Sequence, residues 1–246
     1  MILAGTTEAT ALAHRVAEQG IAATVSFAGR VDRPRRQPLP QRLGSFGGVE
    51  GLVAYLHSAR ITHVVDATHP FAVRMSRNAV GACARTGLPL LALTRPAWTP
   101  APGDRWQTVP DIQGAVAALD QPRKRVLLAV GRMHLPEFAV NPQHFYLLRL
   151  VDPPTDPVLF PDAHVIVDRG PFEVEADRHV MRSHRIELVV SKNSGGSGAF
   201  AKIAAARALD LPVIMIDRPA PPPRREVHTV DAVMSWLAHP ATALGV

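Results

Sequence analysis

The chain has 246 residues, of which 47% are hydrophobic, so it can form one large domain or two small ones and is too apolar for global disorder. Its net charge of +6, with only 5% aromatic residues, favours an acidic small-molecule ligand over nucleic acid, because single-strand binders usually need more aromatic stacking surface. The single cysteine, Cys83, excludes an internal disulfide and a cysteine-rich zinc site. No apolar run reaches the roughly 18 residues that span a bilayer, and no secretory signal is evident, so we expect a cytoplasmic protein that binds no membrane.

Short apolar strands and amphipathic helices alternate through the first half of the chain. The first helix is expected at residues 7–19, because Ala9, Leu12, Ala13 and Val16 fall on one face and Gly20 follows as a stop signal. In chain order, the expected strands cover residues 2–4, 22–28, 62–66, 88–93 and 106–109. The other expected helices cover residues 48–59, 70–86 and 111–119. This alternation is typical of parallel sheets that helices cover on both faces.

The segment QPRKR, residues 121–125, is the expected boundary between two domains, because the alternation resumes after it. Strands are expected at residues 126–130, 145–150, 164–167, 188–191 and 213–216, and helices at residues 172–184, 199–209 and 230–238. We therefore predict an α/β protein of two Rossmann-like domains, residues 1–120 and 121–246, with mainly parallel sheets and an interdomain cleft.

The stretch LAGTTEA, residues 3–9, leads from the first expected strand into the first helix. Free N–H groups of such a turn, together with the helix dipole, can bind a phosphate. Only Gly5 of a full G-x-G-x-x-G pattern is present, so an ordinary strand-to-helix turn remains an equal alternative. Glu8 would repel a phosphate unless its carboxylate is directed elsewhere.

An arginine-rich segment, SFAGRVDRPRR at residues 26–36, follows the second expected strand. An NAD-selective fold usually has an acidic residue at this place, which holds the ribose 2′-hydroxyl. Here the position offers Gly29 and Arg30, and an arginine suits a 2′-phosphate, hence NADP rather than NAD. A solvated basic loop is the alternative.

The glycine-rich segment GSFGGVEG, residues 44–51, precedes and enters the next helix. Gly47 and Gly48 would allow a flat ligand or a ribose phosphate to approach the backbone closely. A flexible connector explains the same glycines.

The segment VVDATHPFA, residues 64–72, delivers polar side chains to the end of the third expected strand. Ligands bind at the carboxyl edge of open α/β sheets. Pro70 suits the first turn of a helix, which would hold Thr68 and His69 over that edge. Thr68 as a helix cap and His69 as a plain loop histidine form the alternative interpretation.

The segment VVSKNSGGSGAFAK, residues 189–202, repeats the strand, glycine-rich turn and helix in the second half. Backbone N–H groups with Lys192 make a receptor for a carboxylate or a phosphate. The lysine precedes the glycines, so the pattern is not a P-loop. We favour a functional site here over a plain turn.

Three further arginines, Arg132, Arg169 and Arg218, each follow an apolar run and are candidates for a ligand-binding edge or for plain surface positions. The eleven histidines show no spacing typical of metal ligands, so no metal site is predicted.

These motifs together resemble the precorrin-6A reductase family of cobalamin biosynthesis, over nearly the whole chain. DATHPFA and KNSGG, in this order and spacing, are the specific ones. The others are GTTEA, AGRV, GSFGGVEGL, VGR, RGP and RP, at residues 5–9, 28–31, 44–52, 130–132, 169–171 and 218–219. The chain departs from the family pattern at Ala4 and Ser45, where glycine is common.

The resemblance implies an NADPH-dependent reduction of one C=C bond in a ring-contracted, polycarboxylate tetrapyrrole, from precorrin-6A to precorrin-6B. The first domain would bind the cofactor, with Thr68 and His69 bordering the nicotinamide and the remaining contacts made by Gly5, Thr6, Thr7, Gly29, Arg30, Phe46, Gly47 and Gly48. The second domain would bind the substrate, together with His69, through Arg132, Arg169, Lys192, Asn193, Ser194, Gly195, Gly196 and Arg218. Lys192 and His69 are the candidate catalytic residues.

Two functions of other classes fit part of the pattern. A non-catalytic NADP-sensing protein would explain the first half and leave KNSGG unused. A tetrapyrrole-binding synthase without a nicotinamide would show no response to NADPH. The sequence leaves open whether the substrate carries cobalt, and what oligomer the chain forms.

Overall fold

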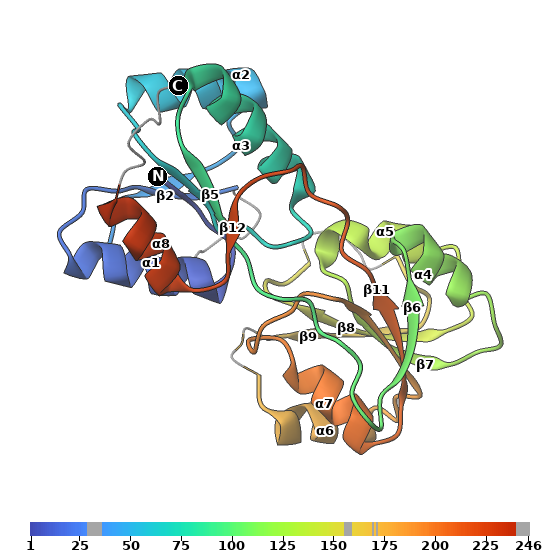
Figure 1. Ribbon diagram of the computed structural model, residues 1–246. Helices are drawn as coiled ribbons and strands as arrows, with labels where there is room; N and C mark the ends of the chain where they lie inside the picture. The colour runs from blue at the N-terminus through green and yellow to red at the C-terminus, as the bar shows by residue number, and fades with distance from the viewer. Residues whose placement is uncertain (29–35, 155–158, 169, 171, 240–246) are drawn as a thin grey trace. The chain divides into compact units, whose positions relative to one another are not determined.

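The computed structural model describes residues 1–28, 36–154, 159–168, 170 and 172–239, and divides the chain into two compact units (Figure 1). Unit 1 comprises residues 1–96 and 220–246, and unit 2 comprises residues 97–219. This division differs from a single boundary at residue 121, because the chain returns to unit 1 near its end. The segment that contains the strand at 105–109 joins unit 2 instead. The alternation of elements does not reveal which strands pair, so the single boundary expected from the sequence did not include this exchange. The cleft expected between the domains stays a prediction.

Unit 1 is built on a parallel sheet in the order β12-β5-β4-β1-β2-β3. Its strands are β1 (Ile2–Leu3), β2 (Val25–Phe27), β3 (Gln41–Leu43), β4 (Val64–Asp66), β5 (Leu90–Leu93) and β12 (Glu226–Val227). The central strands β1 and β4 are buried, as strands covered on both faces must be. The order runs outward from β1 in both directions, which is the arrangement of dinucleotide-binding sheets.

Helices cover both faces of the sheet of unit 1 (Figure 1). Helices α1 (Thr7–Glu18) and α8 (Val230–Ala238) pack on one face, and α2 (Val49–Ser58) and α3 (Val73–Thr86) pack on the other. The four buried residues of α1 are the four that the sequence places on its inner face. Helical periodicity therefore identified this packing surface correctly.

Unit 2 repeats the architecture, with a parallel sheet in the order β6-β11-β10-β7-β8-β9. Its strands are β6 (Arg105–Val109), β7 (Arg125–Ala129), β8 (Phe145–Leu150), β9 (Ala163–Val167), β10 (Leu188–Lys192) and β11 (Pro212–Ile216). Helices α4 (Ile112–Ala118) and α5 (Leu135–Phe138) lie on one face, and α6 (Val174–Ser183) and α7 (Ala201–Ala208) on the other (Figure 1). The predicted α/β class with two mainly parallel sheets is confirmed.

The sequence missed the shortest elements. Strands β3 and β12 have three and two residues, and α5 with the preceding 3-10 turn at Arg132–His134 is also short. Such segments are too brief to show periodicity. Helix α3 begins at Val73 and not at Pro70, because the Ala72 N–H donates to the His69 carbonyl at 2.7 Å and closes a separate turn first.

Within the described part of the chain, no helix has the length and apolar character that crossing a membrane requires. The same residues contain no group of three or more His, Cys, Asp and Glu side chains suited to a metal ion.

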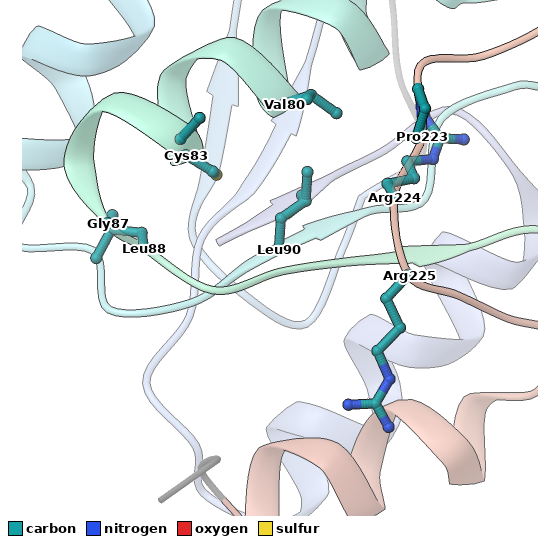
Figure 2. A pocket seen from close by; sticks show the side chains of 9 residues that line it. Val80, Cys83, Gly87, Leu88, Leu90, Pro223, Arg224 and Arg225 are labelled. Atoms are coloured by element: carbon teal, nitrogen blue, oxygen red, sulfur yellow. The ribbon is translucent and has the colours of Figure 1, made fainter. Parts of the chain in front are cut away.

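A pocket of about 380 Å³ opens on unit 1 between the end of α3 and the segment before β12 (Figure 2). Val80, Cys83 and Leu90 form its apolar wall, and Arg224 and Arg225 lie on the other side. Among the described residues, none of those predicted to bind a ligand lines it. Burial raises the pKa of the Cys83 thiol to about 11, and the negative charge of Asp66 acts in the same direction.

The Cys83 thiol should therefore resist alkylation in the folded protein. Raising the pKa from 9.0 to about 11 lowers the thiolate fraction at pH 8 about 100-fold, and only the thiolate is the nucleophile. Iodoacetamide labelling followed by mass spectrometry, with and without urea, measures the difference. Equal labelling rates in the folded and the unfolded chain would contradict the expectation.

Candidate functional site

The turn after β1 and the loop after β4 lie side by side at the carboxyl edge of unit 1. The two strands pair in parallel with Leu3 opposite Asp66. Gly5 has a φ of +154°, and a Cβ atom added to it would lie 3.7 Å from the His69 nitrogen and 4.0 Å from the Thr68 Cα. The structure thus brings two predicted sets together, the Gly5–Thr7 turn and the pair Thr68 and His69.

Thr6 connects this turn to the neighbouring loop. Its hydroxyl accepts from the Ala9 N–H at 3.1 Å, which caps α1, and donates to the Ala67 carbonyl at 2.9 Å. The N–H groups of Thr7 and Glu8 have no acceptor within the helix, as is general for a first turn. With the positive end of the helix dipole, these donors fit a phosphate of a dinucleotide.

Glu8 is directed to a partner that the sequence analysis missed. Its carboxylate forms an ion pair with Arg95 at 2.8 Å and accepts from the Thr7 hydroxyl at 3.1 Å. The Arg95 side chain is 11% exposed, so this positive charge is fixed close to the turn. Glu8 is thereby compensated and does not exclude a phosphate. Arg95 follows an apolar run and precedes a proline, as Arg218 does, so a signal for it was present.

Asp66 is a second residue that the sequence analysis did not assign. The carboxylate is 1% exposed and accepts from four donors. One oxygen accepts from the Thr68 N–H at 3.1 Å and the Thr68 hydroxyl at 2.7 Å. The other accepts from Ser76 at 2.6 Å and from Arg224 at 2.9 Å. Asp66 therefore holds the loop that carries Thr68 and His69, and Thr68 bonds to Asp66 instead of capping α3.

The glycine-rich segment after β3 is ordered by a neighbouring arginine. Arg42 donates to the carbonyls of Gly44 and Ser45 at 2.6 and 2.9 Å, and its guanidinium lies 3.7 Å from the centre of the Phe46 ring. Gly47 and Gly48 have φ values of +79° and +100°, with open space where a Cβ would be. Because β3 borders β2, this segment lies at the same carboxyl edge as the Gly5 turn. Arg42 thus gives this segment defined contacts.

Three predicted site residues, Gly29, Arg30 and Arg169, lie outside the described residues. The assignment of Arg30 to a 2′-phosphate therefore rests on the sequence alone. Strand β2, which precedes these residues in the first unit, ends at Phe27 beside β1.

In unit 2, the KNSGG loop follows β10 and is held by contacts within the unit. The Asn193 amide accepts from the Trp98 N–H at 2.8 Å and donates to the Trp98 carbonyl at 2.9 Å. The Trp98 indole donates to the Gly196 carbonyl at 2.7 Å. Arg218 donates to the carbonyls of Asn193 and Ser194, both at 2.9 Å. Asn193 and Arg218 thus shape the loop, a task that the sequence did not reveal.

The backbone turns of this loop resemble a receptor for an anion. Gly195 and Gly196 have φ values of +67° and +66°, and the Ser194 N–H donates to the Lys192 carbonyl at 2.8 Å. Lys192 is the last residue of β10 and is partly exposed. Strand β7 pairs with β10, so the exposed Arg132, which follows β7, lies at the same edge of the sheet. Lys192 and Arg132 are thus placed at the same edge of the sheet as the loop.

Known proteins resemble this chain over its whole length. A family model described as precorrin-6x reductase CbiJ/CobK matches residues 1–238. A precorrin-6A reductase of Rhodobacter capsulatus is 56% identical, over 100% of this chain and 98% of the relative. A precorrin-6A reductase of Mycobacterium tuberculosis is 40% identical, over 97% of this chain and 96% of the relative. A cobalt-precorrin-6A reductase of Priestia megaterium is 29% identical, also over 97% of this chain and 96% of the relative. A solved structure titled CobK precorrin-6A reductase matches with a TM-score of 0.95 and 56% identity, over 100% of this chain and 98% of that one. Sequence and fold agree over the whole length, and the chain belongs to the precorrin-6x reductase family.

Proposed function

We propose that this chain reduces one C=C bond of precorrin-6A to give precorrin-6B, with NADPH as the hydride donor, in cobalamin biosynthesis. The full-length match to reductases of this family supports an oxidoreductase over both a non-catalytic sensor and a synthase without nicotinamide. The substrate is the metal-free form. Relatives at 56% and 40% identity carry the name precorrin-6A reductase, whereas the one at 29% is named for the cobalt-bearing substrate.

One observation supports the cofactor site best, namely the contact of Gly5 with the Thr68–His69 loop. These residues follow β1 and β4, from which the strand order runs in opposite directions, and dinucleotides bind at such switch points. The Gly5–Thr7 turn holds the diphosphate, and Gly47 and Gly48 approach the adenosine side. Thr68 and His69 border the nicotinamide, which supplies the hydride when bound.

The substrate carboxylates bind unit 2. Lys192, Arg132 and the N–H groups of Gly195 and Gly196 receive them, with Ser194 beside them, while Asn193 and Arg218 keep the loop in shape. After the hydride has been added, the neighbouring carbon needs a proton, and Lys192 and His69 are the side chains proposed to supply or guide it.

Thermal unfolding with NADPH or NADH, combined with turnover of metal-free and cobalt-bearing precorrin-6A, tests this function. We expect NADPH to stabilise the protein more than NADH at equal concentration, and the metal-free substrate to be reduced faster. A protein that NADPH does not stabilise, or that oxidises none of it in the presence of either substrate, would refute the proposal.

Replacing Arg30 by alanine should weaken NADPH binding and leave NADH binding nearly unchanged. Loss of a charged hydrogen bond to the 2′-phosphate predicts about 10- to 100-fold weaker NADPH binding. Isothermal titration calorimetry measures both cofactors. Arg182→Ala on α6, which removes an exposed arginine of unit 2, controls for the change in net charge. Equal weakening of both cofactors would remove the assignment of Arg30.

A further inference from the structure

Arg42 in β3 carries a positive charge that is held in place without an acidic partner. Its guanidinium donates to the carbonyls of Gly44 and Ser45 at 2.6 and 2.9 Å, and both of these acceptors are neutral. Among the residues that the structure describes, no carboxylate forms an ion pair with Arg42. The half-buried guanidinium is therefore fixed in position, and its charge is not neutralised by the described part of the protein.

Two other shielded arginines of unit 1 are compensated differently. Arg95 pairs with Glu8 at 2.8 Å, and Arg224 pairs with Asp66 at 2.9 Å. Removing a charge partly from water costs free energy, which an opposite charge offsets. Arg42 has carbonyl dipoles and aromatic rings where these two have carboxylates. A bound anion would supply the missing negative charge.

The aromatic contacts of Arg42 limit what its guanidinium can bind. The central carbon lies 3.7 Å from the centre of the Phe46 ring and 5.1 Å from that of Tyr55. These contacts use the flat surface of the group, so it offers a ligand mainly the N–H groups on its edge. Only two printed bonds, to the two carbonyls, draw on its five N–H groups. Such an edge suits the oxygen atoms of a phosphate better than a stacked base.

Arg42 also lies beside the end of the second strand of the sheet. It stands opposite Ser26 in the parallel pair of β2 and β3. The Gly44 N–H donates at 3.0 Å to the carbonyl of Phe27, the last residue of β2. In dinucleotide-binding folds, the end of this strand is where the substituent on the 2′ position of the adenosine ribose is recognised. The charge of Arg42 is thus placed where a 2′-phosphate would need it.

We propose that Arg42 binds the 2′-phosphate of NADPH and is a determinant of the preference for NADPH over NADH. This inference rests on the proposed function, and it assigns a second arginine to the phosphate group for which Arg30 is expected. The carbonyls of Gly44 and Ser45 and the ring of Phe46 hold the guanidinium before the cofactor arrives. This reduces the entropy that a long side chain loses when it binds a ligand.

Replacing Arg42 by methionine tests this role, because methionine keeps an apolar stem over Phe46 and removes the charge. By calorimetry, we expect NADP⁺ to bind about 10-fold more weakly and NAD⁺ to bind within about twofold of wild type. The fragments 2′,5′-ADP and 5′-AMP, which lack the nicotinamide half, should show the same contrast. Equal weakening of NADP⁺ and NAD⁺ would mean that Arg42 only shapes the glycine-rich segment, and it would overturn the inference.

Two further variants separate the shape of the guanidinium from its charge. Arg42→Lys keeps the charge without the planar fork and should lose about 3- to 5-fold of the preference for NADP⁺, which keeps the test open if the methionine variant does not fold. Arg15→Met removes an equal charge from the last turn of α1, where Arg15 is 49% exposed and pairs with Asp231 at 3.4 Å. This control should keep the full preference, because an exposed pair contributes little. An unchanged preference in both Arg42 variants would overturn the inference.

Phosphorus-31 NMR of bound 2′,5′-ADP gives a measurement that a purely structural role would not move. A nearby cation favours the doubly charged phosphate, so the 2′-phosphate in the wild-type complex should stay a dianion below its ordinary second pKa of about 6. In the Arg42→Met complex, its pKa should move back toward that of the free nucleotide. The same pKa in both complexes would contradict a contact with Arg42 and leave the reductase function intact. A wild-type protein that does not bind NADP⁺ would instead refute the proposed function.

Discussion

Replacing Gly51 by alanine should destabilise unit 1 by about 2 kcal/mol, although alanine is the better helix former. Gly51 lies in the first turns of α2, and a Cβ atom there would be 1.6 Å from the Phe46 carbonyl oxygen. This contact is with backbone, so it cannot be relieved by turning a side chain. Phe46 is itself held between Arg42 and Tyr55, whose ring centre lies 5.3 Å from that of Phe46. The glycine-rich segment must therefore shift, and NADPH binding should weaken with it.

Gly81→Ala on α3 is the matched control for this substitution. Its added Cβ would be 3.3 Å from a methyl group of Val49, which can give way by a few tenths of an ångström. We expect its free energy of unfolding to stay within about 1 kcal/mol of wild type, because the gain in helix propensity offsets mild crowding. Urea unfolding followed by circular dichroism compares the two variants. A Gly51→Ala protein as stable as Gly81→Ala would show that the segment at 44–48 adapts freely.

The sequence predicted the fold well where elements were long enough to repeat a pattern. The inner face of α1 and the full extent of β8 and α8 follow from periodicity and from Gly, Thr and Pro signals at their ends. Strand β12 has only two residues after a proline-rich loop, and its pairing with β5 is a contact between distant parts of the chain. The exchange of segments between the units depends on such pairings, which no local pattern encodes.

The loops of the candidate site could be predicted from the sequence, but the residues that hold these loops in place could not. Gly5, Thr68 and KNSGG each sit at a strand end, where local signals mark them. Asp66 and Arg224, by contrast, are 158 residues apart in sequence and meet only because β12 returns beside β5. Asn193 was expected to bind substrate, yet both ends of its amide bond to the Trp98 backbone, 95 residues away. A buried amide is identified as a support only once its partners are known.

The two units hold their polar loops in place with different side chains. Each places its polar loop after the strand that pairs with the central strand, β4 beside β1 and β10 beside β7. In unit 1 a carboxylate, Asp66, holds the loop through Thr68. In unit 2 an amide and a guanidinium, Asn193 and Arg218, hold it through backbone carbonyls. In unit 2, this arrangement places Gly195 and Gly196 next to Lys192, a combination that suits an anion.

Replacing Lys192 by alanine should lower kcat/KM for precorrin-6A about 30- to 100-fold and leave the affinity for NADPH unchanged. Removing a charged hydrogen bond to a carboxylate, or a proton donor, costs about 2–3 kcal/mol of transition-state stabilisation. The loop itself should survive, because the Lys192 backbone makes its contacts: the carbonyl accepts from Ser194 whatever the side chain is. Steady-state kinetics at saturating NADPH and calorimetry with NADP⁺ separate the two effects.

Two further lysine variants decide how Lys192 acts. Lys192→Arg keeps the positive charge and gives up a proton far less readily, so a carboxylate anchor would retain most of kcat, whereas a proton donor would lose kcat at nearly unchanged KM. Lys124→Ala removes an equivalent charge at the opposite, amino edge of the same sheet, where Lys124 faces Glu187 at 3.7 Å and is 40% exposed. It should leave kcat/KM within about twofold of wild type, because a surface pair of this kind contributes little. If Lys124→Ala impaired turnover as much as Lys192→Ala, the effect would be one of net charge, and the KNSGG loop would lose its assignment as the carboxylate receptor.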